Sequence, residues 1–246
     1  MQIIPLPEGI FTVDRSKIFQ PFILGQDELQ HRPVGSLLVE VQPFLVITEQ
    51  DYILLDTGLG FKINGELQIH INLRKHGISP EKITKVLLSH LHKDHTGGIC
   101  FHDTYGNLEP SFPFANYYVQ RKELDYAAER SGTSYIPQTV AFLKTYEKVN
   151  ILDGSGRIEN YIEYSLSGGH SPFHQVFKII ENEEIIFYGG DEAPQLQQMK
   201  NKVIAKYDYD GRRSMQLRQE WWQQGNPGNW SFLFYHDVKK PVFQSK

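Results

Sequence analysis

Three histidines and an aspartate crowd into the stretch SHLHKDHTGG, directly after the apolar run KVLL. Neutral imidazole and carboxylate are the ligands that suit zinc and its neighbouring transition metals. In a turn after a strand, His90 and His92 can point to one spot while Leu91 packs inward, and Asp94 and His95 can point to a second spot nearby. The chain has ten histidines and three of them lie here, which favours a metal site over a polar loop with chance histidines.

A metal ion needs more ligands than this stretch supplies. His170, Asp191 and His236 each follow an apolar run that is typical of a strand, and glycines precede the first two, which lets the backbone approach closely. We therefore expect two ligand groups that share Asp191, whose two oxygens can bridge two metals. The expected groups are His90, His92 and His170, and Asp94, His95 and His236.

Apolar, β-branched runs alternate with helix-like patterns along the whole chain, which predicts an α/β layered architecture. The expected strands lie at 36–48 (two, or one bent at Pro43), 52–55, 85–88, 117–120, 161–166, 176–180, 184–188 and 230–235. The expected helices lie at 66–76, 121–130, 138–148 and 195–224, the last with a break at Asp210-Gly211.

Charge and cysteine content narrow the functional classes. The net charge of −4 gives no pull toward nucleic acid or an anionic membrane, so neither is expected as a partner. The single cysteine, Cys100, lies in an apolar stretch and is expected in the core rather than at a metal. No signal peptide is recognised at the start and no apolar run reaches the length of a membrane span, so a cytoplasmic location is expected.

The pattern His-x-His-x-Asp-His, followed by a histidine, an aspartate and a histidine, resembles the metallo-β-lactamase superfamily. The segments LLDTG (54–58), YVQRKEL (118–124), GHSPFHQ (169–175) and FYHD (234–237) also look similar to that family, and length and these segments resemble the N-acyl-homoserine lactonase branch. The resemblance implies an α/β fold, an αβ/βα four-layer sandwich, with residues 1–246 as a single domain of two similar halves. It also implies two divalent metal ions, with zinc expected first and iron, manganese or cobalt also suitable.

The reaction that the resemblance implies is hydrolysis of a small-molecule lactone or related ester by a hydroxide held between the two metals. Asp94 and Asp191 would be the catalytic residues as well as metal ligands. Asp56 either accepts a hydrogen bond from a ligand imidazole or only shapes the Asp-Thr-Gly bend. His174 is expected to support the site or the structure around it.

One position departs from the lactonase pattern. These lactonases carry a tyrosine three residues after the bridging aspartate, and here that position is Pro194, which has no proton to donate. Tyr207 or Tyr209 could serve instead, or the substrate could differ, since ordinary surface packing also explains these tyrosines.

Two aromatic pairs have open roles. Phe19 and Phe22 lie in a stretch without clear periodicity, and Trp221 and Trp222 end the last expected helix. Each pair could line an acyl-sized pocket, pack in the core or form a contact between subunits, and the sequence leaves the oligomeric state open.

Rival activities come from the same superfamily and from outside it. A glyoxalase II-like thioesterase would carry a helical domain after His236, and a phosphodiesterase or nuclease is disfavoured by the acidic balance. A flavodiiron-type oxidoreductase needs a glutamate where His92 stands. A non-catalytic metal-binding protein is disfavoured because all seven ligand positions are filled.

Overall fold

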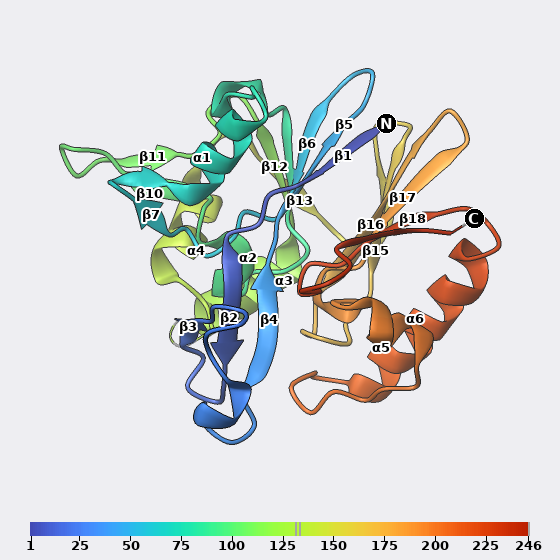
Figure 1. Cartoon of the computed structure of the whole chain (residues 1–246). Helices are drawn as coiled ribbons and strands as arrows, with labels where there is room; N and C mark the ends of the chain where they lie inside the picture. The colour runs from blue at the N-terminus through green and yellow to red at the C-terminus, as the bar shows by residue number, and fades with distance from the viewer. Residues whose placement is uncertain (131, 133, 246) are drawn as a thin grey trace.

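The computed structural model describes residues 1–130, 132 and 134–245. Two six-stranded sheets face each other, with helices on their outer sides (Figure 1). The strands of the first sheet, in spatial order, are β1 (Gln2–Pro5), β5 (Phe44–Ile47), β6 (Tyr52–Leu55), β9 (Lys85–Leu87), β12 (Asn116–Gln120) and β13 (Val149–Leu152). Those of the second are β14 (Gly156–Ile158), β15 (Ile162–Leu166), β16 (Gln175–Glu181), β17 (Glu184–Tyr188), β18 (Ser231–Leu233) and β19 (Val242–Gln244).

Side chains alternate across the first sheet and thereby build two layers of core. Leu54 points outward to the cluster that α1, α3 and α4 complete, whereas its neighbours Ile53 and Leu55 point inward to the second sheet. Phe177 and Tyr188 meet them there from the second sheet. The helices on this outer face are α1 (Gln68–Lys75), α3 (Arg121–Glu129) and α4 (Pro137–Thr145).

The outer face of the second sheet is covered by α5 (Leu196–Lys200) and α6 (Gly211–Gly225). Trp221 of α6 packs on Phe187 of β17 with the ring centroids 4.9 Å apart, and Trp222 packs on Phe232 and Phe243. The order of layers is therefore helix, sheet, sheet, helix, which confirms the predicted α/β four-layer sandwich.

Smaller elements extend from this sandwich. A three-stranded sheet consists of β2 (Gly9–Val13), β3 (Phe19–Pro21) and β4 (Leu37–Val41), and two hairpins consist of β7 (Lys62–Ile63) with β8 (Glu66–Leu67) and β10 (Cys100–His102) with β11 (Leu108–Pro110). The short helices are α2 (Lys93–Thr96) and the 3₁₀ turns η1 (Leu29–His31), η2 (Pro80–Lys82) and η3 (Gly190–Glu192). Of the helices described, none combines the length and the apolar character needed to cross a lipid bilayer.

The helical stretch predicted over 195–224 is wrong at residues 201–210, although the break predicted at Asp210-Gly211 coincides with the start of α6. Residues 201–210 separate α5 from α6 as an irregular segment. Here the backbone N–H of Tyr209 donates to the carbonyl of His170, and that of Asp210 donates to Gly169. Hydrogen bonds to a distant loop therefore replace the local hydrogen bonds of a helix.

Strand direction brings the polar strand ends to one edge of the sandwich. β6, β9 and β12 run parallel in the first sheet. In the second, β17 runs parallel to β18, and two antiparallel steps through β16 make β15 parallel to β17. The segments that follow β9, β15, β17 and β18 carry the seven expected ligands, so the topology places these residues where they can meet.

Candidate metal centre

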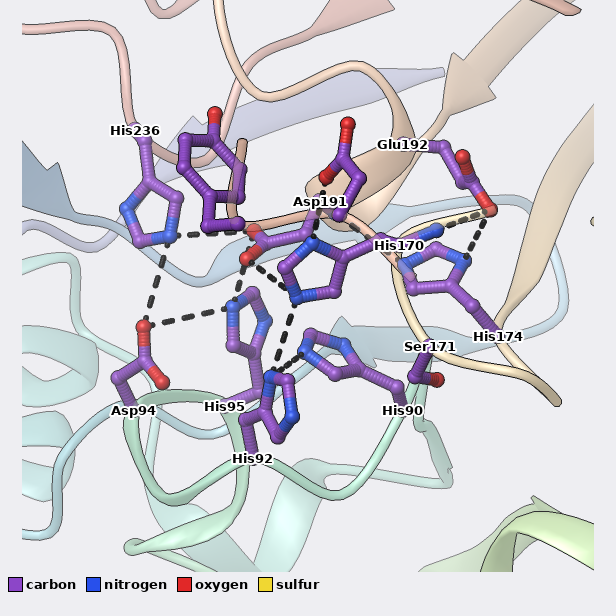
Figure 2. A network of polar contacts seen from close by, with 12 residues as sticks. His90, His92, Asp94, His95, His170, Ser171, His174, Asp191, Glu192 and His236 are labelled. Carbon is purple, nitrogen blue, oxygen red and sulfur yellow. Dashed lines mark hydrogen bonds and ion pairs between the residues drawn. The ribbon is translucent and has the colours of Figure 1, made fainter. Parts of the chain in front are cut away.

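The turn after β9 is shaped so that its side chains point two ways. Leu91 is buried in the core beneath the helices, while His90 and His92 on either side of it point toward His170 in the polar network (Figure 2). The carbonyl of His92 accepts from the N–H groups of His95 and Thr96, and this begins the single turn of α2. That turn carries Asp94 and His95 to a second position, as the sequence predicts.

The first group consists of three histidines with their nitrogens in contact. Nδ1 of His92 lies 2.9 Å from Nε2 of His90 and 3.1 Å from Nε2 of His170. Nitrogens bound to one tetrahedral zinc ion at about 2.0–2.1 Å lie roughly 3.3 Å apart. The three imidazoles therefore have the spacing of a ligand set, and Asp191 joins them within 4.8 Å.

The second group consists of Asp94, His95 and His236, whose ligand atoms lie within 4.8 Å of one another. Asp191 stands between the two groups (Figure 2). Its Oδ2 is 3.2 Å from Nε2 of His170, and its Oδ1 is 3.1 Å from Nε2 of both His95 and His236. The carboxylate thus offers one oxygen to each group.

Buried atoms without a hydrogen-bond partner mark the space between these groups. Nε2 of His95 and Oδ1 of Asp191 are both buried and neither makes a hydrogen bond among the described residues, although they face each other at 3.1 Å. An unsatisfied buried polar atom is costly. A divalent cation would satisfy both atoms, so the donor set fits the metals that the sequence implies.

Protonation within the cluster follows from burial and from the two carboxylates. Burial, reinforced by His170, lowers the pKa of His92 to about 3, so this imidazole is neutral and able to bind a metal. Burial also disfavours the charged form of His236, but Asp191 and Asp94 outweigh it and raise the pKa of His236 to about 10. In the metal-free chain, a proton on a histidine with a raised pKa, such as His236, balances the charge of the neighbouring carboxylates. Metal binding would release that proton.

The nitrogens that face away from the cluster have fixed partners. Nδ1 of His95 lies 2.8 Å from Oδ2 of Asp56, and Nδ1 of His236 lies 2.6 Å from the carbonyl oxygen of Glu40. Nδ1 of His90 lies 3.1 Å from Oγ of Ser89. Such partners fix the tautomer and the ring orientation of a metal-binding histidine.

Asp56 fills both roles that the sequence leaves open. It accepts hydrogen bonds from the backbone N–H and the hydroxyl of Ser89 at 2.8 and 2.6 Å, and from the hydroxyl of Tyr188 at 2.5 Å, in addition to its contact with His95. Its φ of 55° is left-handed, as the Asp-Thr-Gly bend requires. The bend therefore aims a buried carboxylate at a ligand.

His174 and two glutamates support the ligands from outside the two groups. Nε2 of His174 accepts from the N–H of Asp191 at 3.2 Å, and burial lowers the pKa of His174 to about 4. Glu192 accepts from the N–H of His170 at 3.0 Å, and Glu123 accepts from the N–H of Leu91 at 3.1 Å. Sequence reasoning did not identify either glutamate, because nothing local marks a carboxylate that holds a distant backbone.

A cavity of about 940 Å³ opens beside the two groups, and His92, Asp94, His170, Asp191 and His236 form part of its wall. Its size lies in the range of small-molecule sites. Phe19 lines this cavity, whereas Phe22 is buried beneath Arg32. Trp221 and Trp222 pack against the second sheet instead. Cys100 is buried in the core, away from both ligand groups.

The two candidate tyrosines lie in different surroundings. Pro194 and Tyr207 both line the cavity, and the ring of Tyr207 has its centroid 5.9 Å from that of His170. Burial raises the pKa of Tyr207 to about 12, so its hydroxyl keeps a proton at neutral pH. Tyr209 is 69% exposed and does not line the cavity.

Comparison with known proteins agrees with this arrangement. The family model of the metallo-β-lactamase superfamily matches residues 38–100. An N-acyl homoserine lactonase of Bacillus cereus is 25% identical to the chain over 199 residues, which cover 73% of this chain and 70% of that protein. An N-acyl homoserine lactonase of Bacillus thuringiensis is 26% identical over the same coverage.

Solved structures share the fold across nearly the whole chain. A probable metal-dependent hydrolase from Staphylococcus aureus has a TM-score of 0.78 at 20% identity and covers 99% of this chain and 91% of its own. AidC, a dizinc quorum-quenching lactonase in complex with a product, has a TM-score of 0.73 at 21% identity and covers 98% of this chain and 88% of its own.

Proposed function

We propose that this chain, which is similar to the metallo-β-lactamase superfamily over residues 38–100 and shares its fold, is a dinuclear metal-dependent hydrolase that opens a lactone. The observation that carries the proposal is the position of Asp191, whose two oxygens face different groups of histidines. A carboxylate placed in this way suits two cations that share one ligand. Zinc is the first expectation for both.

The proposed division of labour follows from the contacts. His90, His92 and His170 would hold one ion, and Asp94, His95 and His236 the other, with Asp191 shared. Two bound divalent cations would supply Lewis-acid polarisation of the ester carbonyl and a water that is ionised at neutral pH.

The remaining task of the chain is to position the ester and to exclude bulk water. The cavity provides the space, with apolar walls at Phe19, Leu38 and Val39. Tyr207 has a protonated hydroxyl in the same cavity, and we assign to it the hydrogen bond that Pro194 cannot make. This donor would stabilise the oxygen that gains charge when the ring opens. The lactonase relatives support a lactone as the class of substrate.

The test is a turnover panel on metal-loaded protein, with chelated protein as the background. The panel contains N-acyl homoserine lactones and other lactones, thioesters of matched acyl length, and an aryl phosphodiester. We expect lactone hydrolysis that depends on metal and little cleavage of the phosphodiester. Thioester turnover without lactone turnover would assign the chain to a thioesterase, and phosphodiester cleavage alone would assign it to a phosphodiesterase.

Metal content is measured on the same preparation. We expect two equivalents per chain by elemental analysis of protein that was never exposed to a chelator. A reproducible value near one would contradict the dinuclear assignment. The turnover panel tests the hydrolase activity independently of this value.

A further inference from the structure

The wall of the cavity carries an excess of positive charge that the metal ligands do not explain. Four cationic side chains line it: Arg15, Lys17, Lys93 and Lys206. Among the described lining residues outside the two ligand groups, Asp14 is the only acid. The chain as a whole has a net charge of −4. The cavity wall outside the ligand groups therefore carries a net positive charge, although the net charge of the whole chain is negative.

The four cations reach the cavity from three separate segments. Arg15 and Lys17 lie in the turn between β2 and β3, Lys93 begins α2 between two candidate ligands, and Lys206 lies in the irregular segment between α5 and α6 (Figure 1). None of the four forms an ion pair within the part of the chain that the structure describes. Like charges that gather without a counter-charge repel one another, and a concave site focuses their potential.

The one acid that lines the described wall outside the two ligand groups, Asp14, is engaged in its own turn. Oδ1 of Asp14 accepts hydrogen bonds from the backbone N–H and the hydroxyl of Ser16, at 2.8 and 2.5 Å. Lys17 follows with a left-handed φ of 60°, a conformation in which asparagine and glycine are the usual residues. The turn itself therefore does not call for a lysine, and Asp14 does not pair with one.

We propose that the substrate carries a second group that is anionic, a carboxylate or a phosphate, bound by Arg15 and Lys17 and assisted by Lys93 and Lys206. This inference rests on the proposed function for the end of the molecule that reacts at the metal centre. The apolar wall at Phe19 is suited to the carbon chain that joins the two ends. A purely alkyl acyl chain would leave all four cations without a partner.

The first test compares two lactones with the same ring and chain length on the metal-loaded protein. One ends in a carboxylate and the other in its methyl ester. We expect kcat/KM to favour the carboxylate by about tenfold at low salt, since each of the two exposed ion pairs, with Arg15 and with Lys17, contributes up to about fivefold. The preference should shrink toward one in 1 M NaCl, because salt screens such pairs.

A double variant, Arg15→Gln with Lys17→Gln, should reduce that preference by about five- to tenfold. The matched control is Lys82→Gln with Lys144→Gln, which removes the same charge from exposed positions outside the cavity. The inference is overturned if the methyl ester is turned over as well as the carboxylate, or if both double variants change the preference equally.

A binding measurement keeps this test separate from that of the proposed function. Calorimetry on the metal-loaded protein compares adipate, monomethyl adipate and 5-phosphonopentanoate, which share one carboxylate and differ at the far end. We expect adipate and 5-phosphonopentanoate, whose far ends are anionic, to bind about tenfold more tightly than monomethyl adipate, and the stronger of them identifies carboxylate or phosphate as the group. Tight binding without any lactone turnover would refute the lactonase proposal alone, and equal binding of all three would refute the anionic group alone.

Discussion

Oδ1 of Asp208 lies 3.1 Å from Nδ1 of His170, although the two residues are 38 positions apart in the chain. The contact ties the irregular segment between α5 and α6 to the histidine that would complete the first ligand group. A carboxylate at Nδ1 orients the ring and leaves Nε2 free to bind a metal. Asp208 is therefore a positioning residue of the proposed centre.

Replacing Asp208 by asparagine should weaken the metal affinity of the three-histidine group by about tenfold, because partners of ligand histidines are commonly worth 10- to 100-fold. Competition with a chromophoric chelator measures this affinity, and circular dichroism checks the fold. The matched control is Asp210→Asn in the same segment, since Asp210 begins α6 by accepting from the N–H of Arg213 and asparagine caps a helix equally well. Equal losses in both variants would mean that Asp208 only supports the segment.

Tyr207→Phe tests the proposed hydrogen-bond donor. Loss of one donor to a developing oxyanion commonly costs about a hundredfold or more, and here we expect kcat on a lactone to fall by about 10- to 100-fold with unchanged metal content. Tyr209→Phe, at the more exposed tyrosine of the same segment (69% against 37% for Tyr207) and outside the cavity lining, should leave kcat within about twofold. Steady-state kinetics on both variants measure this difference. An unchanged kcat in Tyr207→Phe would mean that Tyr207 is not the hydrogen-bond donor.

Asp94→Ala tests the second ligand group. The backbone carbonyl of Asp94, which accepts from the hydroxyl of Tyr235 at 2.6 Å, is retained in this variant, so the turn should keep its shape. We expect one metal equivalent instead of two and a loss of at least about a hundredfold in kcat/KM. Elemental analysis and circular dichroism are measured side by side. A variant that keeps both metals and full activity would contradict the role of Asp94.

The sequence alone was enough to predict that the seven candidate ligands lie close together. The reason is the topology of the two sheets. Each ligand segment follows a strand, and the ligands that follow β9 of the first sheet meet those that follow the mutually parallel β15, β17 and β18 of the second. The order of residue types along the chain was therefore almost sufficient to describe the two groups. The alternation of strand-like and helix-like patterns was enough to predict an α/β layered architecture, whereas the four-layer sandwich was predicted from the family resemblance.

The residues that sequence reasoning missed contact the site from distant positions in the chain, so no spacing of residues in the sequence marks them. Asp208 reaches His170, and Glu192 reaches the backbone of the same loop, without any repeat or motif around them. The segment 201–210 was predicted as helix up to a break at Asp210-Gly211, although most of its residues, NKVIAKYDYD, are weak helix formers. Its hydrogen bonds to Gly169 and His170 are visible only in three dimensions, so local propensity could not predict its course.

Glu8 gives a prediction about stability and pH. This carboxyl is 6% exposed, and its Oε2 accepts from the N–H of Leu59 at 2.6 Å while Oε1 has no partner. Burial raises the pKa of Glu8 to about 8, against an ordinary value of 4.5. Between these two values the unfolded chain loses the proton and the folded chain keeps it. Stability contributed by the neutral carboxyl is therefore lost as the pH rises from about 4.5 to 8.

Glu8→Gln should remove this loss, because the amide keeps an acceptor for Leu59 and has no charge to bury. The free energy of unfolding of the variant, relative to the native chain, should rise by about 3.5 kcal/mol between pH 5 and pH 8. This is less than roughly 1.4 kcal/mol for each of the three pH units, because Glu8 is partly titrated in the unfolded chain at pH 5 and in the folded chain at pH 8. Urea unfolding of metal-loaded protein at several pH values measures the difference, and taking the difference cancels the titration of groups common to both chains. Glu147→Gln, at an exposed position, provides the control. If the two variants keep the same pH slope, the proton does not reside on Glu8, and the carboxyl is ionised in the folded protein.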